Sequence, residues 1–585
     1  MKILTLQTKV VGYHMRRIIT TLYICCITIF SLSSQTPVPL IPEAPKYETR
    51  AVWLTTFNSL DWPKTKVTTK SGIEKQKEEL CDILDHLKAL NINTVLLQTR
   101  VRATTIYPSA IEPWDGSLTG SIGKSPGYDP LQFAIEECHK RGMELHAWVV
   151  TIPCFKTNVA NKMGTKSVLK NKRNICVRHH DSWYLDPGHP QTAIYLASIC
   201  KEITENYDID GIHLDYIRYP ENAKRFNDHA SYRLYGKKKN KSQWRRENIT
   251  HCVRTIYQTV KTIKPWVKVS SAPVGKFDNL TRYSSYNWNA YSAVYQDAQG
   301  WLREGIQDML FPMMYFQGNH FYPFAIDWKE NEYDGYVAPG LGIYFLSPKE
   351  KDWNLSVITR ELSFTRTIGM GGQAYFRYAF LKENHKGICD FLKYDFYPYP
   401  ALPQPCKRTE NNPPNAPKEL KKQMETSGTV LSWSPVDNAN KNGIRYNVYA
   451  SKTSPVCTDS ARHLIATNLQ DCYYPINDVY AIVHGYHFAV TAIDRFGNES
   501  TATPLVVTEG EQTMAAPDFL KHDSQYLYLP EQEHPYVAFT DIFGRIISVV
   551  PYREKISIKK LPKGLYQVRT LGKKGRTFKI GSFIK

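Results

Sequence analysis

Short apolar segments alternate with amphipathic segments between residues 48 and 398, and this alternation constrains the fold more than any other feature. The apolar segments lie at 51–56, 94–101, 143–152, 211–217, 267–274, 308–316, 336–345 and 371–380. Between most of them, apolar residues recur at helical spacing. Helices are predicted at 72–91, 131–141, 190–206, 243–264 and 356–367. Eight strands alternating with helices favour a closed (β/α)8 barrel. An open doubly wound sheet is the alternative, although no Gly-rich phosphate motif follows the first strand.

The pattern changes beyond residue 398, where helical spacing gives way to loops and short strands. Residues 399–413 are rich in Pro and polar residues, which predicts a stiff linker. Residues 414–510 and 515–585 each alternate apolar and polar residues between turns, which predicts two small all-β domains. The expected architecture is therefore α/β: a (β/α)8 TIM barrel over residues 45–398, followed by two small β-sandwiches.

The N-terminal segment predicts export. Arg16 and Arg17 precede the apolar run IITTLYICCITIF, and the small residues Ser31, Ser33 and Ser34 follow it. This order is typical of a secretory signal peptide, which we place at residues 1–35. The apolar run is also short for a membrane span, which needs about 20 residues. We therefore expect the mature protein in the periplasm, on the cell surface or in the medium.

The charge balance limits the choice of partners. Lysine and arginine outnumber aspartate and glutamate by 74 to 55, a formal net charge of +19. An exported chain without a nucleic-acid-binding motif is not expected to bind nucleic acid. Nine basic residues lie between Lys224 and Glu247, and this run predicts either a solvated loop or a rim for an anionic ligand. Because the Cys and His residues lack the spacing of metal ligands, we expect no metal or other cofactor. Separately, we expect the protein to be a monomer.

The fourth predicted strand carries the strongest candidate for chemistry, within the segment DGIHLDYIRYP (210–220). With a period of two, His213, Asp215 and Ile217 share one face, which points into a barrel. An inward carboxylate among apolar residues is costly unless it is paired or functional. We therefore interpret Asp215 as catalytic, with Arg218 as an available counter-charge. The alternative is a buried pair that only braces the barrel.

Other strand ends and loops add polar and aromatic side chains to the same mouth. The residues predicted to bind substrate there are Trp53, Arg100, His146, Trp148, Asp186, His213, Arg218, Tyr315 and Arg377. Flat rings suit stacking on sugars, and charged or amide groups suit hydrogen bonds to hydroxyls. These residue types together predict a carbohydrate cleft.

Glycoside hydrolysis usually needs two carboxyl groups. Asp215 is the first, as nucleophile, base or group that orients the substrate. A general acid needs a partly apolar setting that raises its pKa. Glu112 lies between Ile111 and Pro113-Trp114 and is the predicted acid; Asp115 and Asp186 are the next candidates.

Five ordered motifs resemble the glycosyl-hydrolase-like family 10, a bacterial (β/α)-barrel family. They are ETRAVWLTTFNSLDWP, QTRVRATTIYPSAIEPW, SPGYDPLQFAIEECHKRGMELHAW, WYLDPGHP and DGIHLDYIRYP. The resemblance implies an exported glycoside hydrolase acting on a polysaccharide or glycan, with peptidoglycan glycan strands among the substrates. This chain departs from the family at Thr104, where many members have Asp, and at Thr151-Ile152-Pro153-Cys154, which replaces Asn-Pro-Tyr-Arg.

DGIHLDYI is also similar in spacing to the strand-4 motif of family-18 chitinases, and Met314-Tyr315 resembles their strand-6 motif. This likeness implies that Asp215 steers an N-acetyl group, and it places Ile217 where chitinases have a glutamic acid. Thr104 and Ile217 leave open a non-catalytic, lectin-like barrel that only binds carbohydrate. A surface adhesin is a third possibility, but it would not need the inward Asp215 and His213.

Two further resemblances concern the predicted β domains. Residues 414–508, ending in AVTAIDRFGNES, resemble a fibronectin type III domain, with Trp433, Tyr446 and Tyr449 predicted in its core. The tail resembles the C-terminal sorting domain of the type IX secretion system. The matching residues are Asp541, Gly544 and Arg545 and the segment LPKGLYQV. This second resemblance implies the secretion machinery as a partner.

Overall fold

The computed structural model describes most of the chain from residue 41 onward. The described ranges are 41–236, 238–283, 288–408, 412–425, 428–436, 443–476, 486–505, 520–531, 536–540, 546–571 and 577–585. The predicted signal peptide and the predicted turn at Asp541, Gly544 and Arg545 lie outside these residues.

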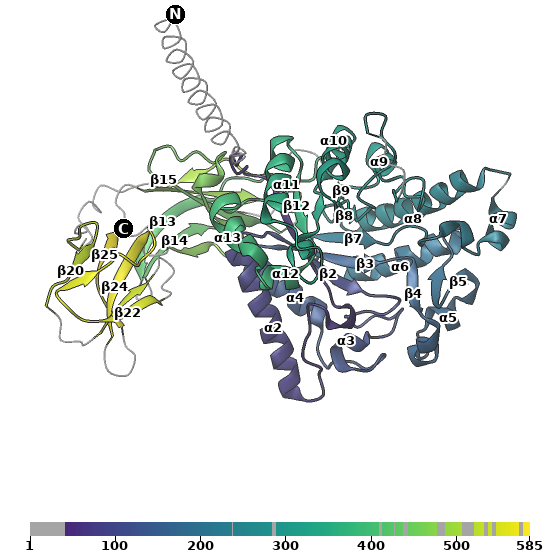
Figure 1. Ribbon diagram of the computed structural model, residues 1–585, viewed down its shortest axis with the longest axis horizontal. Coiled ribbons are helices and arrows are strands. Elements are labelled where there is room, and N and C mark those ends of the chain that lie inside the picture. Colours follow the sequence, from purple (N-terminus) through teal and green to yellow (C-terminus); the bar gives the residue numbers. More distant parts are fainter. Residues whose placement is uncertain are drawn as a thin grey trace, which may run out of the picture. The chain divides into compact units, whose positions relative to one another are not determined.

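Residues from Thr49 to Tyr375 form a closed parallel barrel, as predicted (Figure 1). Its strands are β1 (Thr49–Leu54), β2 (Thr94–Arg100), β3 (Glu144–Val150), β7 (Gly211–Asp215), β8 (Lys268–Ser271), β9 (Met309–Leu310), β10 (Tyr336–Val337), β11 (Gly340–Leu341) and β12 (Gly372–Tyr375). The sheet order is β10-β9-β8-β7-β3-β2-β1-β12-β11. Because β10 and β11 are two parts of one extended segment, the two ends of this order meet. The predicted eight strands are therefore confirmed, and the open sheet is excluded.

Amphipathic helices surround the strands. They are α2 (Lys70–Ala89), α4 (Pro130–Lys140), α6 (Pro190–Asn206), α8 (Lys241–Ile263), α9 (Ala298–Arg303), α10 (Tyr322–Glu330) and α11 (Leu355–Thr367). Helix α2 buries Leu80, Leu84 and Leu87, at the spacing that places side chains on one helical face. Helix α8 starts where the Asn240 side chain accepts hydrogen bonds from the backbone N–H groups of residues 242 and 243.

Apolar side chains fill the barrel interior up to the level of Asp215. The buried members of this core are Ala51, Trp53, Leu96, Trp148, Val150, Ala272, Met309, Phe311, Ala338 and Ala374. The barrel is therefore packed rather than hollow, and a substrate can only reach its ends.

Two long connections build a wall on the side where the strands end. The connection from β3 to α6 carries the antiparallel strands β4 (Pro153–Lys156), β5 (Cys176–His179) and β6 (Ser182–Leu185), and the connection from β7 to α8 carries α7 (His229–Tyr235). The two connections touch, because the ring of His179 lies 5.6 Å from that of Phe226. Figure 1 shows β5 and α7 at the same end of the barrel. Active sites of such barrels lie at this end.

The first of the two β units, which follows the barrel in the chain, is a two-sheet sandwich. Its strands are β13 (Lys418–Glu425), β14 (Gly428–Ser434), β15 (Arg445–Ser451), β16 (Leu464–Leu469), β17 (Tyr473–Pro475), β18 (His487–Ile493) and β19 (Thr503–Pro504). The sheets have the orders β13-β14-β17 and β16-β15-β18-β19. Trp433 and Tyr446 pack in the core, but Tyr449 belongs to a different cluster with Leu402. The prediction for Tyr449 was wrong because residues three apart on a strand point to opposite faces.

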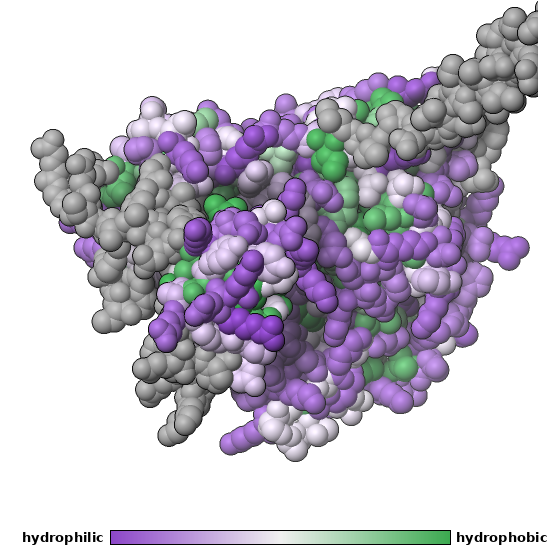
Figure 2. Space-filling view, turned by 60° about the vertical axis from the view of Figure 1, so that its left-hand side comes forward, coloured by the Kyte–Doolittle hydropathy of each residue, from purple (hydrophilic) through white to green (hydrophobic). Residues whose placement is uncertain are grey.

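The C-terminal β unit also consists of antiparallel strands. They are β20 (Tyr526–Tyr528), β21 (Tyr536–Thr540), β22 (Ile546–Pro551), β23 (Lys555–Ser557), β24 (Leu565–Leu571) and β25 (Thr577–Ile584). The face of the molecule drawn in Figure 2 is mostly hydrophilic, with hydrophobic residues in small separate patches. No helix in the described part of the chain combines the length and the apolar character that crossing a bilayer requires.

The start of the segment predicted as a stiff linker is bound along the base of the barrel, where the strands begin. Leu402 is fully buried, and its backbone N–H donates to the Lys46 carbonyl. Beside Leu402, the β-sandwich contributes Arg445 and Arg495, which both contact the same carboxylate oxygen of Asp210, at 3.2 and 3.1 Å. Burial of the backbone and of ion pairs along this junction joins the sandwich to the barrel.

Replacing Gly142 by alanine should destabilise this junction. An added Cβ would lie 2.2 Å from the Thr467 carbonyl oxygen, and Gly142 also has a φ of +68°. Gly120 is the matched control, because its φ is +83° and nothing lies within 4 Å of an added Cβ. We expect Gly142→Ala to lose about 1–3 kcal/mol more than Gly120→Ala, measured by urea denaturation. Equal urea midpoints for the two variants would contradict the close packing of Gly142 against Thr467 of the sandwich.

Candidate functional site

Asp215 is the last residue of β7 and lies at the mouth of the barrel. Its carboxylate accepts a hydrogen bond from the Trp148 indole N–H at 3.1 Å and one from the Tyr216 backbone N–H at 2.7 Å. The side chain faces inward, since Asp215 is in register with Val150, a member of the interior core. Asp215 is only 6% exposed.

The surroundings of Asp215 make it a weak acid near neutrality. Burial raises the pKa of Asp215 to about 6, against the opposing effects of the two hydrogen bonds and of Arg218 and Arg102. A carboxyl group that titrates near the working pH exchanges protons efficiently. This property suits a general acid or base.

Tyr216 shapes the end of the strand. It has a φ of 50°, in the left-handed region that costs a non-glycine residue about 1–2 kcal/mol. This conformation ends β7 at Asp215 and turns the Tyr216 N–H onto Asp215 Oδ1. Strained backbone of this kind is often found where a fold must hold a functional group in place.

Tyr315 brings an unused hydroxyl to the mouth. Its buried hydroxyl group has no hydrogen-bond partner among the described residues. Burial, and next the negative charge of Asp215, raises the pKa of Tyr315 well above its ordinary value. Its ring lies 5.5 Å from Phe376 and 5.7 Å from Tyr344. Tyr315 therefore holds a buried, neutral hydroxyl group within electrostatic range of Asp215.

Arg218 lies between two aromatic rings. Its guanidinium carbon is 4.8 Å from the Tyr216 ring centre and 5.4 Å from that of Trp288. The Trp288 side chain is 37% exposed, so it can present a ring to solvent for stacking. Sequence analysis missed Trp288, because it lies in a long loop without a strand-end pattern.

Glu221 is a second carboxylate that contacts Arg218 directly. Its Oε1 lies 3.2 Å from Arg218 Nη2, and its side chain is 69% exposed. Asp215 and Glu221 both raise the pKa of Tyr216, after the larger effect of burial. Sequence analysis also missed Glu221, although it lies in the loop that directly follows β7.

The structure does not bring Glu112 and Arg100 to the mouth. Both Glu112 carboxylate oxygens bind Arg100, at 2.7 and 2.6 Å, and one also accepts from the Tyr195 hydroxyl on α6. Neither side chain is exposed. The role of acid predicted for Glu112 therefore needs correction, because a closed ion pair reaches no substrate.

A bulge explains why Arg100 was misplaced. Gln98 pairs with Trp148 of β3, but Arg100 pairs with Val149, so Thr99 is an extra residue. After the bulge, Arg100 points outward toward α6 and not into the mouth where the sequence had placed it.

His146, His213 and Trp53 lie below the mouth. The Trp53 indole N–H donates to His213 Nε2, and His213 Nδ1 lies 3.0 Å from Ser270 Oγ. Burial holds the pKa of His213 well below its ordinary value, so the ring stays neutral. His213 and Trp53 are therefore enclosed in the barrel interior rather than exposed to substrate.

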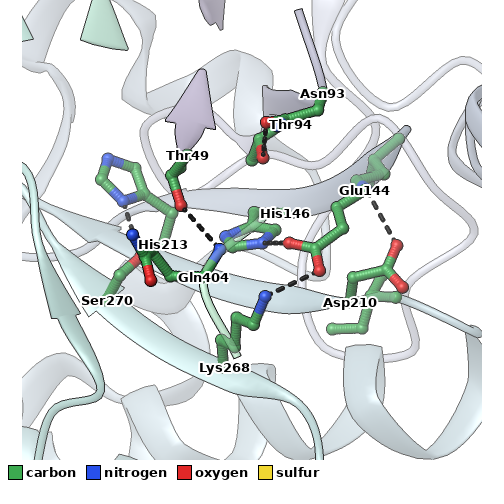
Figure 3. A network of polar contacts seen from close by, with 12 residues as sticks. Thr49, Asn93, Thr94, Glu144, His146, Asp210, His213, Lys268, Ser270 and Gln404 are labelled. Carbon is green, nitrogen blue, oxygen red and sulfur yellow. Dashed lines mark hydrogen bonds and ion pairs between the residues drawn. The ribbon is translucent and has the colours of Figure 1, made fainter. Parts of the chain in front are cut away.

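His146 belongs to a polar network where the strands begin, opposite the mouth. Figure 3 shows its ring beside Glu144, which also binds Lys268 at 2.7 Å. The prediction that His146 lines the cleft was wrong about its depth. It stands near the first residue of β3, whereas Trp148 stands one inward position closer to the strand end.

Asp186, Arg377 and Asp115 also have structural partners. Asp186 accepts hydrogen bonds from Ser231 and from a backbone N–H, and Arg377 binds Asp61 at 2.5 Å. Asp115 caps α3 (Gly116–Thr119) and accepts from the Thr104 hydroxyl at 2.6 Å. Of the predicted residues, the structure gathers Asp215, Trp148, Arg218 and Tyr315.

Within the described residues, no group of three or more His, Cys, Asp or Glu side chains is arranged to hold a metal ion.

Comparison with known proteins gave matches over the barrel and beyond. Residues 48–339 match the family described as "Glycosyl hydrolase-like 10". The chain is 31% identical to "Glycosyl hydrolase YngK" of Bacillus subtilis (strain 168) over 486 residues, which cover 78% of this chain and 92% of that protein. It is 34% identical to "Glycosyl hydrolase DigH" of Escherichia coli (strain K12) over 289 residues, which cover 46% of this chain and 65% of that protein.

Solved structures also align with part of this chain. The catalytic domain of β-amylase from Paenibacillus polymyxa aligns with a TM-score of 0.40 and 10% identity, covering 61% of this chain and 99% of that one. The PgaB (BpsB) glycoside hydrolase domain from Bordetella bronchiseptica aligns with a TM-score of 0.38 and 12% identity, covering 60% of this chain and 98% of that one.

The closed (β/α)8 barrel and the family match over it together make this a glycosyl-hydrolase-like protein. The chain belongs to the glycosyl hydrolase-like 10 family, as the relationship to YngK and the match over the barrel show. The predicted family is confirmed. The fibronectin type III and sorting identities of the two β units stay predictions.

Proposed function

We propose that this protein is an exported glycoside hydrolase that cleaves glycosidic bonds in a polysaccharide, with peptidoglycan glycan strands as the first substrate to test. The observation that carries the proposal is Asp215, a buried carboxyl group with a pKa raised to about 6 at the end of a barrel strand. Export and a sorting role for the C-terminal β unit are part of the proposal and rest on the sequence resemblances.

Each residue at the mouth has a role in the proposed reaction. Asp215 donates its proton to the oxygen of the leaving sugar, and the N–H groups of Trp148 and Tyr216 keep the carboxyl group oriented. Glu221, as the second carboxylate, activates water. The Tyr315 hydroxyl donates to the bound sugar, and Trp288 offers a ring for stacking.

A non-catalytic carbohydrate-binding barrel is the second candidate. The observation that favours it lies at Thr104, which binds Asp115 and leaves the loop after β2 without a free carboxylate at the mouth. The two functions differ in product. An enzyme releases new reducing ends, whereas a binding protein retains the glycan unchanged.

The test is incubation of the purified full-length chain with a glycan panel that includes peptidoglycan strands stripped of peptides. Reducing-end release and product masses should show cleavage of at least one glycan. Retention of a glycan without any release, across the panel, would replace the enzyme by the binding protein.

The pH dependence should show which form of Asp215 is active. Because the proton donor must be protonated, kcat/KM should fall as the pH rises through about 6. Reducing-end assays between about pH 4 and 8 would measure this limb. A rise of kcat/KM through the same range would instead assign Asp215 as base or nucleophile.

A further inference from the structure

Exposed basic residues cover the connection between β3 and α6. Residues 156–180 contain seven Lys or Arg and no Asp or Glu. All seven side chains are exposed: Lys156, Lys162, Lys166, Lys170, Lys172, Arg173 and Arg178. A segment of this length without any carboxylate places a concentrated positive charge beside the barrel mouth.

The connection between β7 and α8 adds a second basic group. Its exposed basic residues in the described part of the chain are Lys224, Arg225, Arg233, Lys238 and Lys239. The two groups belong to one surface, because the His179 and Phe226 rings pack together and His179 Nε2 approaches the Glu221 carbonyl at 3.4 Å. We call these two sets of residues the basic rim.

Few carboxylates neutralise the basic rim. Asp181 lies 3.5 Å from Lys156, and Glu247 binds Lys239 at 2.5 Å. Asp228 is fully buried against Arg245, so its charge is already compensated. Lys162, Lys170, Lys172, Lys224, Arg225 and Arg233 form no ion pair with a described carboxylate. A cluster of positively charged surface groups that lack carboxylate partners attracts a polyanion from a distance.

We propose that the basic rim binds a polyanionic glycan, a chain of sugars that carries carboxylate groups, and guides it to the mouth. The inference rests on the proposed function and adds the charge class of the substrate. A glycan is favoured because the two basic groups lie on the connections that follow β3 and β7, the strands that bring Trp148 and Asp215 to the mouth. A polymer held on the rim therefore lies next to the proposed catalytic group.

Binding of polygalacturonate to the full-length Asp215→Asn variant tests the rim without cleavage of the polymer. Two triple variants are made in that background: Lys162, Lys170 and Lys172→Gln in the first group, and Lys224, Arg225 and Arg233→Gln in the second. The matched control replaces three exposed lysines elsewhere, Lys70, Lys75 and Lys452→Gln. Dextran serves as the neutral glycan, and duplex DNA and phosphatidylglycerol vesicles serve as other anionic surfaces.

We expect each rim triple variant to bind polygalacturonate about fivefold or more weakly at low salt, while the control binds like its parent. Affinity should fall with added salt, and dextran should bind weakly. Equal binding by parent and rim variants, or tighter binding of DNA or vesicles than of polygalacturonate, would overturn the inference. If no glycan in the panel is cleaved but the rim variants still lose binding, the hydrolase proposal fails and the rim stands.

Discussion

Asp215→Asn should lower kcat on a cleaved glycan by about 10²–10⁴-fold, the usual contribution of a general acid. The asparagine has nearly the same shape and can keep the hydrogen bond from the Tyr216 N–H, so the mouth should keep its geometry. It has no proton of suitable acidity to give to the leaving sugar. Reducing-end assays at saturating substrate would measure the loss, with a smaller change in KM.

The same variant should be more stable than its parent at neutral pH. Burial raises the pKa of Asp215 from 3.8 to about 6, so the folded state holds the proton more tightly than the unfolded state. The resulting stability is present at low pH and is lost as the pH rises from about 4 through 6. The shift corresponds to up to about 3 kcal/mol of stability that the charged carboxylate costs at neutral pH. The uncharged asparagine avoids this cost but gives up the hydrogen bond from the Trp148 N–H, because its NH2 group cannot accept, so the net gain should be smaller. Thermal denaturation at pH 7 would show the gain.

Asp186→Asn is the matched control. Asp186 is also buried, and burial raises its pKa too, but its carboxylate accepts hydrogen bonds from Ser231 and the Gly188 N–H and contacts none of the mouth residues described above. Its substitution should leave kcat near the parent value. If Asp215→Asn keeps full activity, Asp215 is not the acid; if both variants lose activity equally, the loss reflects disturbed packing.

Glu112→Gln should destabilise the fold by about 3–5 kcal/mol, because it leaves the buried Arg100 guanidinium without its counter-charge. Both Glu112 oxygens bind Arg100, and neither side chain reaches solvent. The folded fraction should keep a kcat close to that of the parent. Urea denaturation and activity per folded molecule would measure the two effects separately.

Two further variants separate charge from packing at this site. Tyr195→Phe removes one hydrogen bond to Glu112 and should cost about 1 kcal/mol. The double variant Arg100→Met with Glu112→Leu removes both charges and should recover most of the stability lost by Glu112→Gln. A large loss of kcat in Glu112→Gln with unchanged stability would return Glu112 to the role of acid.

The local pattern predicted much of the barrel. Each of the eight strands overlaps its predicted apolar segment, because burial of a strand and of one helical face produces a periodic pattern of apolar residues along the chain. The same periodicity predicted that Asp215 points inward at a strand end. The family resemblance rested on these same segments and was confirmed.

Side-chain roles were harder to predict, because they depend on contacts between distant segments. The bulge at Thr99 turned Arg100 outward, and no periodic pattern announces one extra residue in a strand. Trp288 and Glu221 lie in loops, so only the folded chain brings them to Arg218.

The sequence by itself determined the barrel and the inward carboxylate, because these follow from which side chains avoid water along a strand or helix. Only the tertiary structure decided which charged groups are paired and which are open to a ligand. The Trp148 indole reaches Asp215 from 67 residues away, and burial by the surrounding segments raises the pKa of that carboxyl group. Dielectric surroundings and ion pairing belong to the assembled fold, whereas periodic burial is already encoded within each short segment.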